Sequence, residues 1–189
     1  MLVMLNLKQI KFFSIGLVFY YSFITFETHA KPTNQYQYSD KKVRIRLLPR
    51  TPEQMAAFYE GRGFSKEMIN RLKQVCFITT GIHNKTQQIL WHNLTHWHFT
   101  NKNGNIKRYT RQYWKNEWKK MRISLAHQST FRWTLLPDEL DFRANEHEGG
   151  NITLPFTSEP FTLTARFKTG KDKAGMPIEI KIENIQCRR

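Results

Sequence analysis

The chain has 189 residues and a formal net charge of +15 at pH 7. This length suits a single domain with its own hydrophobic core, and the sequence contains no repeat of fixed period and no low-complexity tract. The excess of lysine and arginine predicts a surface that attracts polyanions.

The first thirty residues have the pattern of an export signal. Lys8 and Lys11 give a positive start, and residues 12–26 (FFSIGLVFYYSFITF) are uncharged and mostly apolar. Ala30 ends this segment with a small residue suited to cleavage. The apolar run is shorter than the ~20 residues that cross a bilayer, so a cleaved signal is favoured over an uncleaved N-terminal anchor. Because no cysteine lies near the cleavage point, we do not expect a lipoprotein.

We therefore expect an exported protein, periplasmic or secreted, whose residues 31–189 form a single domain. The two cysteines, Cys76 and Cys187, both lie in this part. An oxidising compartment favours a disulfide between them, and two separate buried thiols are the alternative. Asn-x-Thr triplets begin at Asn84, Asn93 and Asn151. They would be glycan acceptors in a eukaryotic secreted protein, but the short signal fits a bacterium equally well.

The first element of the exported part is a predicted strand over residues 43–47. Val43, Ile45 and Leu47 alternate with Arg44 and Arg46, which predicts an apolar inner face and a basic outer face.

Residues 51–74 predict a helical hairpin. Thr51 can cap the first helix, Pro52 suits the first helical position, and Gln54 completes a capping-box spacing. After a glycine-containing break, Ser65 can cap the second helix.

From Cys76 onward the pattern is mostly that of β-strands. Runs of alternating apolar and polar residues cover 76–84, 89–93, 95–100, 129–136, 151–156, 161–168 and 177–183. In the fourth run (STFRWTLL), the alternation places Phe131, Trp133 and Leu135 on one face. Clean alternation is typical of antiparallel sheets with one wet face, and seven or eight such strands predict a two-sheet β-sandwich.

One basic helix is predicted between these strands, over residues 109–122 (YTRQYWKNEWKKMR). Trp114 and Trp118 lie on one stripe, and the adjoining stripe carries Arg111, Lys115, Lys119 and Arg122. Like charges at this spacing destabilise a lone helix, which favours a nearby anion. The helix could bind an anionic membrane surface with its tryptophans as anchors. The alternative is a solvated charged face whose tryptophans pack on the sandwich.

Three histidines lie within seven residues in the segment ILWHNLTHWHFTNKNG (89–104). In an unbroken strand, His92, His96 and His98 share one face, and Trp91, Trp97 and Phe99 share the other. Imidazoles suit copper or zinc, and His147, His127, Glu146 or Glu148 could supply a further donor. However, residues 92 and 98 lie about 20 Å apart in a straight strand, and only the pair 96 and 98, at about 7 Å, could share a metal directly. The alternative is a wet strand face that happens to carry histidines.

The common catalytic motifs, GxSxG, HExxH, the P-loop and GxGxxG, are absent from the sequence. We therefore expect no enzyme. A hydrolase with Glu146 or Glu148 as base would need a pocket around residues 146–148.

Two stretches resemble known groups. The run from CFITTGIHNKTQQILW through WHFTNKNG resembles the opening hairpin of exported bacterial immunoglobulin-like sandwich domains. The segments RTPEQMAAFYEGRGF, FRWTLLPDELDF and GGN resemble a group of exported proteobacterial proteins that has no known activity. These resemblances imply a mainly β, antiparallel, immunoglobulin-like sandwich, to which the sequence adds the N-terminal helical hairpin and one inserted basic helix.

Together these features predict a non-enzymatic envelope binding or accessory protein whose basic face engages an anionic partner. Lipid headgroups, a cell-wall polymer and an acidic protein are the candidate partners, and nucleic acid is less available outside the cytoplasm. We expect no cofactor, with copper or zinc at the histidines as the alternative, and the oligomeric state is left open.

Overall fold

A computed structural model describes residues 35–189, so the predicted export signal (residues 1–30) lies outside the described residues. The strands are β1 (Tyr36–Ser39), β2 (Val43–Arg50), β3 (Val75–Asn84), β4 (Leu90–Asn93), β5 (Trp97–Asn101), β6 (Gly104–Asn105), β7 (Glu139–Phe142), β8 (His147–Pro155), β9 (Phe161–Thr169) and β10 (Gly175–Ile185). The α-helices are α1 (Pro52–Glu60), α2 (Lys66–Leu72), α3 (Arg111–Lys120) and α4 (Leu125–Thr134), and short 3₁₀ turns are η1 (Leu94–His96) and η2 (Lys171–Lys173). None of these helices is long and apolar enough to cross a membrane.

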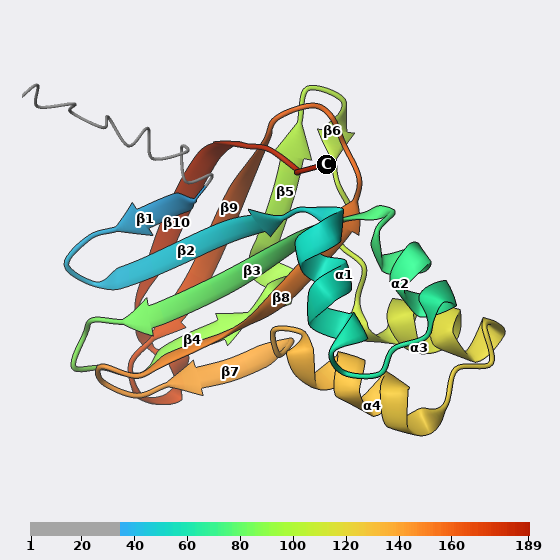
Figure 1. Cartoon of the computed structure of the whole chain (residues 1–189). Coiled ribbons are helices and arrows are strands. Elements are labelled where there is room, and N and C mark those ends of the chain that lie inside the picture. The colour runs from blue at the N-terminus through green and yellow to red at the C-terminus, as the bar shows by residue number, and fades with distance from the viewer. Residues whose placement is uncertain (1–34) are drawn as a thin grey trace, which may run out of the picture. The chain divides into compact units, whose positions relative to one another are not determined.

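The strands form two antiparallel sheets, an arrangement consistent with a β-sandwich (Figure 1). The first sheet has the order β1-β2-β3-β8. In the second sheet, β10 pairs with one edge of β9. Strands β4 and β5 share the other edge, and each pairs with a different part of β9. Strand β7 extends this sheet beside β4, and β6 extends it beside β5.

The main hydrophobic core lies between the two sheets. Alternate residues of β2 are fully buried, and the same alternation runs through β9 and β10, with Phe161, Leu163, Ala165, Phe167, Ile178, Ile180 and Ile182 inside. The alternation therefore predicted the inner faces of these strands correctly. Each buried aliphatic or aromatic side chain contributes roughly 1.5–3 kcal/mol through removal of its surface from water.

One disulfide joins the two sheets. Cys76 of β3 is bonded to Cys187, which follows β10, and their Cα atoms lie 5.3 Å apart. The predicted pairing is confirmed, and the bond closes a loop with a sequence separation of 111 residues.

A second core lies between the helices and the outer face of the first sheet. Its fully buried aromatic members include Tyr59, Trp114, Trp118 and Phe131, which surround Phe77 of β3. Helices α1 and α2 begin at capping residues that their sequences predict. Thr51 and Gln54 form a capping box, and the hydroxyl of Ser65 accepts a hydrogen bond from the backbone N–H of Met68.

The strand predicted over residues 129–136 is wrong, because this segment continues helix α4. The hydroxyl of Ser124 accepts a hydrogen bond from the N–H of His127 and so begins the helix. Phe131 and Leu135 are both buried, while Trp133 is 82% exposed. Residues at i and i+4 share a face of a helix, so Phe131 and Leu135 satisfied the strand pattern by coincidence.

The asparagines of the Asn-x-Thr triplets have structural roles, as Asn84 and Asn151 show. Asn84 is fully buried, and its side-chain Nδ2 donates to the carbonyls of Gln88, Phe142 and Arg143. Asn151 donates from Nδ2 to the carbonyl of Thr134 at the end of α4. Asn84 is therefore closed to a glycan in the folded protein.

Candidate anion-binding site

Helix α3 directs its tryptophans into the protein. Trp114 and Trp118 are each 1% exposed, and their rings stack with centroids 4.8 Å apart. Both rings also contact Phe131 of α4, and the indole Nε1 of Trp114 donates to Thr153 Oγ1 at 2.8 Å. The prediction that these tryptophans anchor the helix in a membrane is wrong, because they belong to the second core.

The basic stripe of α3 is divided between a pocket and open solvent. Arg111 is half-buried, and both it and Lys115 line a pocket between α3 and α4. Lys119 is exposed on the same helix and Arg122 is exposed just beyond its end, and both lie outside the lining of this pocket. The four residues therefore do not act as one surface.

The pocket between α3 and α4 has a volume of about 680 Å³. Its walls carry the edges of Trp114, Trp118 and Phe131, and its rim adds the basic residue Arg132 from α4. Arg132 was not predicted as a site residue, because the sequence pattern of residues 129–136 predicted a strand in place of α4. The Ser124-x-x-His127 capping position was the signal that could have found this helix.

Arg111 is the most constrained cation of the pocket. Its Nη2 donates to the carbonyl of Leu135 at 2.9 Å, whereas its buried Nε has no hydrogen-bond partner among residues 35–189. Burial lowers the pKa of Arg111, and the positive charges of Arg132 and Arg108 lower it further although Asp138 opposes them. A buried donor without a partner and beside like charges is costly, and an incoming anion would relieve both costs.

Two acidic residues, Asp138 and Glu139, also line the pocket, and both already have partners. Asp138 forms an ion pair with Arg108 at 2.9 Å, and Glu139 accepts a hydrogen bond from Asn93 Nδ2 at 2.7 Å. Glu117, the acidic residue of α3 itself, accepts from the hydroxyl of Tyr113 at 2.7 Å and faces Arg71. Within the described part of the chain, no carboxylate forms an ion pair with Arg111, Lys115 or Arg132, although the charge of Asp138 acts on Arg111.

The predicted histidine face is broken at η1. Asn93 Oδ1 accepts hydrogen bonds from the N–H and hydroxyl of Thr95, and this turn reverses which side chains point inward. His92 is consequently 2% exposed and lies in the main core, where it contacts Trp97 and Phe167.

Burial lowers the pKa of His92 to about 4, and its Nε2–H donates to the carbonyl of Pro137 at 3.1 Å. The prediction that His92 shares a wet face with His96 and His98 is therefore wrong.

The other candidate metal ligands are also separated. His98 is exposed on β5, whereas His147 belongs to β8 of the other sheet and lies beside His83, with ring centroids 6.1 Å apart. Within residues 35–189, no three or more His, Cys, Asp or Glu side chains form a group that could hold a metal ion. Binding of copper or zinc stays an untested prediction, without the ligand set proposed for it.

Of the acidic residues considered for hydrolysis, Glu148 lies at the start of β8, and Glu146 lies in the turn just before it. Glu146 and Glu148 are both exposed, and a Glu146 oxygen accepts from the backbone N–H of Arg143 at 2.7 Å. This contact closes the turn between β7 and β8, so Glu146 has a structural partner.

Comparisons with known proteins assign no family. No protein-family model matches the chain, and no curated protein matches it. One solved structure that matches is a protein of Bacillus subtilis subsp. subtilis str. 168, provisionally described as a lipoprotein, with a TM-score of 0.43 and 10% sequence identity. The match covers 79% of this chain and 38% of that one, so this chain spans well under half the length of that protein. A likeness at this level carries no functional assignment.

Proposed function

We propose that this chain is a non-enzymatic, exported binding protein of the cell envelope, and that its α3–α4 pocket binds an anionic group of an envelope component. The disulfide between Cys76 and Cys187 supports export, because such bonds persist in oxidising compartments. The two antiparallel sheets and the disulfide between them also suit an immunoglobulin-like sandwich, which we include in the proposal.

The observation that carries this proposal is the meeting of Arg111, Lys115 and Arg132 at one pocket. Arg111 lines this pocket, and its buried Nε has no hydrogen-bond partner among residues 35–189. Arginine binds carboxylate and phosphate through planar, charge-assisted hydrogen bonds, which are about twice as strong as neutral ones. Trp114 and Phe131 line the same pocket, and charge-assisted hydrogen bonds are stronger beside apolar surroundings than in water.

The burial of Trp114 and Trp118 limits the ways in which α3 can bind a partner. Helix α3 has no free aromatic face with which to enter lipid, so its partner must bring an anionic group to the pocket. A lipid headgroup and the charged group of a cell-wall polymer both meet this requirement, and an acidic side chain of a protein partner is the third source.

Charge reversal inside and outside the pocket tests the proposal. Residues 31–189 are expressed in an oxidising compartment and pelleted with phosphatidylglycerol vesicles, with phosphatidylcholine vesicles and with purified cell-wall sacculi. The test variant is Lys115→Glu/Arg132→Glu. The matched control is Lys119→Glu/Lys120→Glu, which makes the same charge change on exposed residues outside the pocket.

We expect the pocket variant to bind at least about tenfold more weakly to one anionic probe, and the control variant to stay within about twofold of the original chain. Equal losses in both variants would assign binding to overall charge. Unchanged binding in the pocket variant would exclude the pocket.

A further inference from the structure

A second basic surface lies on the outer face of the first sheet. Beyond the helical layer, β2 and β3 show this face to solvent (Figure 1). Arg44, Arg46 and Arg50 alternate on the outer side of β2, and none of them forms an ion pair with a carboxylate among residues 35–189. This cationic row is independent of the α3–α4 pocket.

A strip without side chains runs across the strands beside Arg46. The strand register places Arg46 directly opposite Gly81, and Gly81 directly opposite Gly149. A Cβ atom added to Gly81 would meet nothing within 4 Å, so the space above this glycine is open. Glycine weakens a strand interior, and it is often found where another molecule approaches the backbone.

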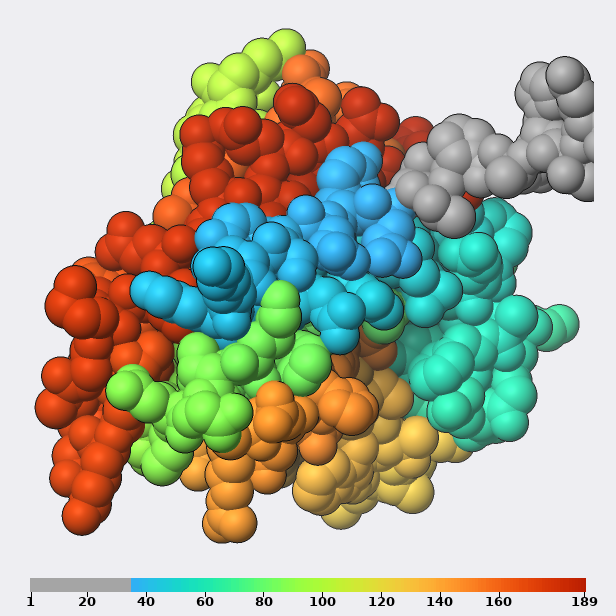
Figure 2. All heavy atoms as spheres, turned by 90° about the vertical axis from the view of Figure 1, so that its left-hand side faces the viewer, coloured from blue at the N-terminus to red at the C-terminus, as the bar shows by residue number. Residues whose placement is uncertain are grey.

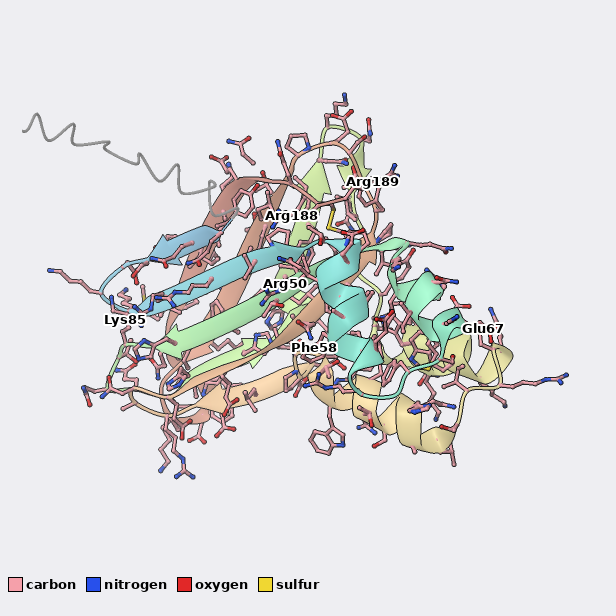
Figure 3. All side chains as sticks on the ribbon, viewed as in Figure 1. Arg50, Phe58, Glu67, Lys85, Arg188 and Arg189 are labelled. Carbon is pink, nitrogen blue, oxygen red and sulfur yellow. A yellow bond between two sulfur atoms is a disulfide. The ribbon has the colours of Figure 1, made fainter. Side chains whose placement is uncertain are left out.

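The strip leads into a cleft of about 420 Å³ between α1, α4 and the sheet. Two exposed aromatic residues stand at its walls, Phe58 of α1 at 40% exposure and Trp133 of α4 at 82%. Figure 3 shows Phe58 and Arg50 at the same part of the sheet face, and both line this cleft. In Figure 2, α1 and α2 (cyan) stand to one side of β2 and the end of β3 (blue and green), with a recess between them.

Arg50 is held in place by a chain of hydrogen bonds along the cleft floor. Its Nε donates to Thr79 Oγ1 at 2.9 Å, and that hydroxyl donates to Asn151 Oδ1 at 2.9 Å. Asn151 Nδ2 in turn donates to the carbonyl of Thr134 at 2.8 Å. The two Nη groups of Arg50 have no hydrogen-bond partner within residues 35–189, so a fixed guanidinium presents free donors to the cleft.

We propose that this surface binds a linear polysaccharide that carries carboxylate or phosphate groups. The exposed ring of Trp133 matches the C–H face of a sugar ring, because an aromatic face is negative and C–H hydrogens are slightly positive. Phe58 lines the same cleft, with the guanidinium of Arg62 over its ring. Amide and hydroxyl groups on the floor suit sugar hydroxyls, and Arg50 and Arg46 suit the anionic substituents.

The shape of the surface indicates a polymer rather than a single sugar. Beside this strip, the outward residues of β8 run from Asn151 through Gly149 to His147, four residues or about 13 Å of strand. His147 and His83 lie at its far end, opposite Arg44, and Arg44 supplies the positive charge there. This surface is distinct from the α3–α4 pocket of the proposed function. Helix α4 lies between the two, with Arg132 lining the α3–α4 pocket and Trp133 lining the cleft on the sheet.

The experiment measures binding of polygalacturonate, a polyanionic saccharide, by calorimetry. Neutral dextran, polyglutamate and single-stranded DNA are the comparison polymers. The blocking variant is Gly81→Val, which fills the strip where a Cβ meets no neighbour, and the platform variant is Trp133→Ala. Valine favours strands, so Gly81→Val should keep or raise the melting temperature.

We expect polygalacturonate to bind more tightly than the other three polymers, and each variant to weaken its binding about tenfold or more, as buried aromatic anchors of interfaces do. Wild-type affinity in both variants would overturn the proposal. Equal or tighter binding of polyglutamate or DNA would overturn the assignment to a saccharide.

A charge control separates this surface from the charge of the whole chain. Arg46→Gln/Arg50→Gln and Arg166→Gln/Lys168→Gln remove the same charge from the two opposite sheets. We expect the first pair to weaken polygalacturonate binding at least tenfold and the second pair to leave it within about twofold. Equal losses would overturn the assignment to the first sheet.

Discussion

His92 is expected to make this protein lose stability in mild acid. Its imidazole is buried in the main core with a pKa of about 4, against an ordinary value near 6.5 in the unfolded chain. Between pH 6.5 and pH 4 the unfolded chain binds a proton that the folded chain does not. The free energy of unfolding therefore falls as pH falls through this window, by 1.36 kcal/mol per pH unit for one group. The full loss is roughly 3 kcal/mol, a large part of the ~5–15 kcal/mol of a typical domain.

The measurement is urea unfolding followed by tryptophan fluorescence at steps between pH 7 and pH 4, for the original chain and for His92→Phe. Phenylalanine fits the surroundings of Trp97 and Phe167 but does not titrate. The variant is needed because a second group also destabilises the folded chain in acid. The hydrogen bond from Tyr113 lowers the pKa of Glu117, so protonation of Glu117 at low pH also lowers the free energy of unfolding. We expect the stability loss of His92→Phe in this window to be smaller by roughly 3 kcal/mol. Identical pH profiles would refute the burial of a neutral His92.

Two further predictions concern the disulfide and the second core. Cys76→Ser/Cys187→Ser removes a disulfide across a separation of 111 residues. We expect the free energy of unfolding, measured with denaturant, to fall by about 5 kcal/mol in the chain-entropy model. A change under ~1 kcal/mol would contradict this prediction. Trp114→Phe should cost ~1–3 kcal/mol more than Trp118→Phe, because only the indole of Trp114 has a hydrogen-bond partner, a threonine hydroxyl of β8. Equal costs for the two substitutions in the same assay would show that this hydrogen bond adds nothing.

The strands were predictable where one face is buried and the other wet. In β9, and in β10 from Ile178 to Ile182, the inward and outward residues alternate without interruption, so a period of two identifies both the strand and its inner face. Register shifts interrupt the alternation near both ends of β10. The rule is weaker for β8, since Ile152, Thr153 and Leu154 are all buried between the main core and the helical layer. No pattern within β8 itself could reveal that helices would cover its outer face.

The prediction that the three histidines share one face is wrong because a single turn, η1, changes which residues point inward. A strand that continued through residue 96 would place His92 outside and Trp91 inside, but η1 exchanges the two sides. The turn rests on Asn93, whose side chain accepts two hydrogen bonds from Thr95, and an Asn two residues before a Thr is a local signal for such a turn.

The α3–α4 pocket was only half predictable. The sequence identified α3 and its basic residues, among them Arg111 and Lys115, from the helical spacing. It could not show that two tryptophans of the same helix would be buried or that Arg132 would face Arg111 across the pocket. Those facts depend on α4, and the spacing of Phe131 in α4 and Leu135 just after it fits a strand and a helix equally well.

The most direct test of the proposed function observes Arg111 itself. Side-chain Nε–H signals of ¹⁵N-labelled arginine are recorded by NMR while glycerol phosphate is titrated into residues 31–189, with Arg122 as the exposed reference outside the pocket. We predict a saturating shift of the Arg111 Nε–H signal and at most a weak, linear shift for Arg122, because only Arg111 presents a buried donor without a partner. An Arg111 signal that stays in place, or that moves in step with Arg122, would contradict an anion site between α3 and α4.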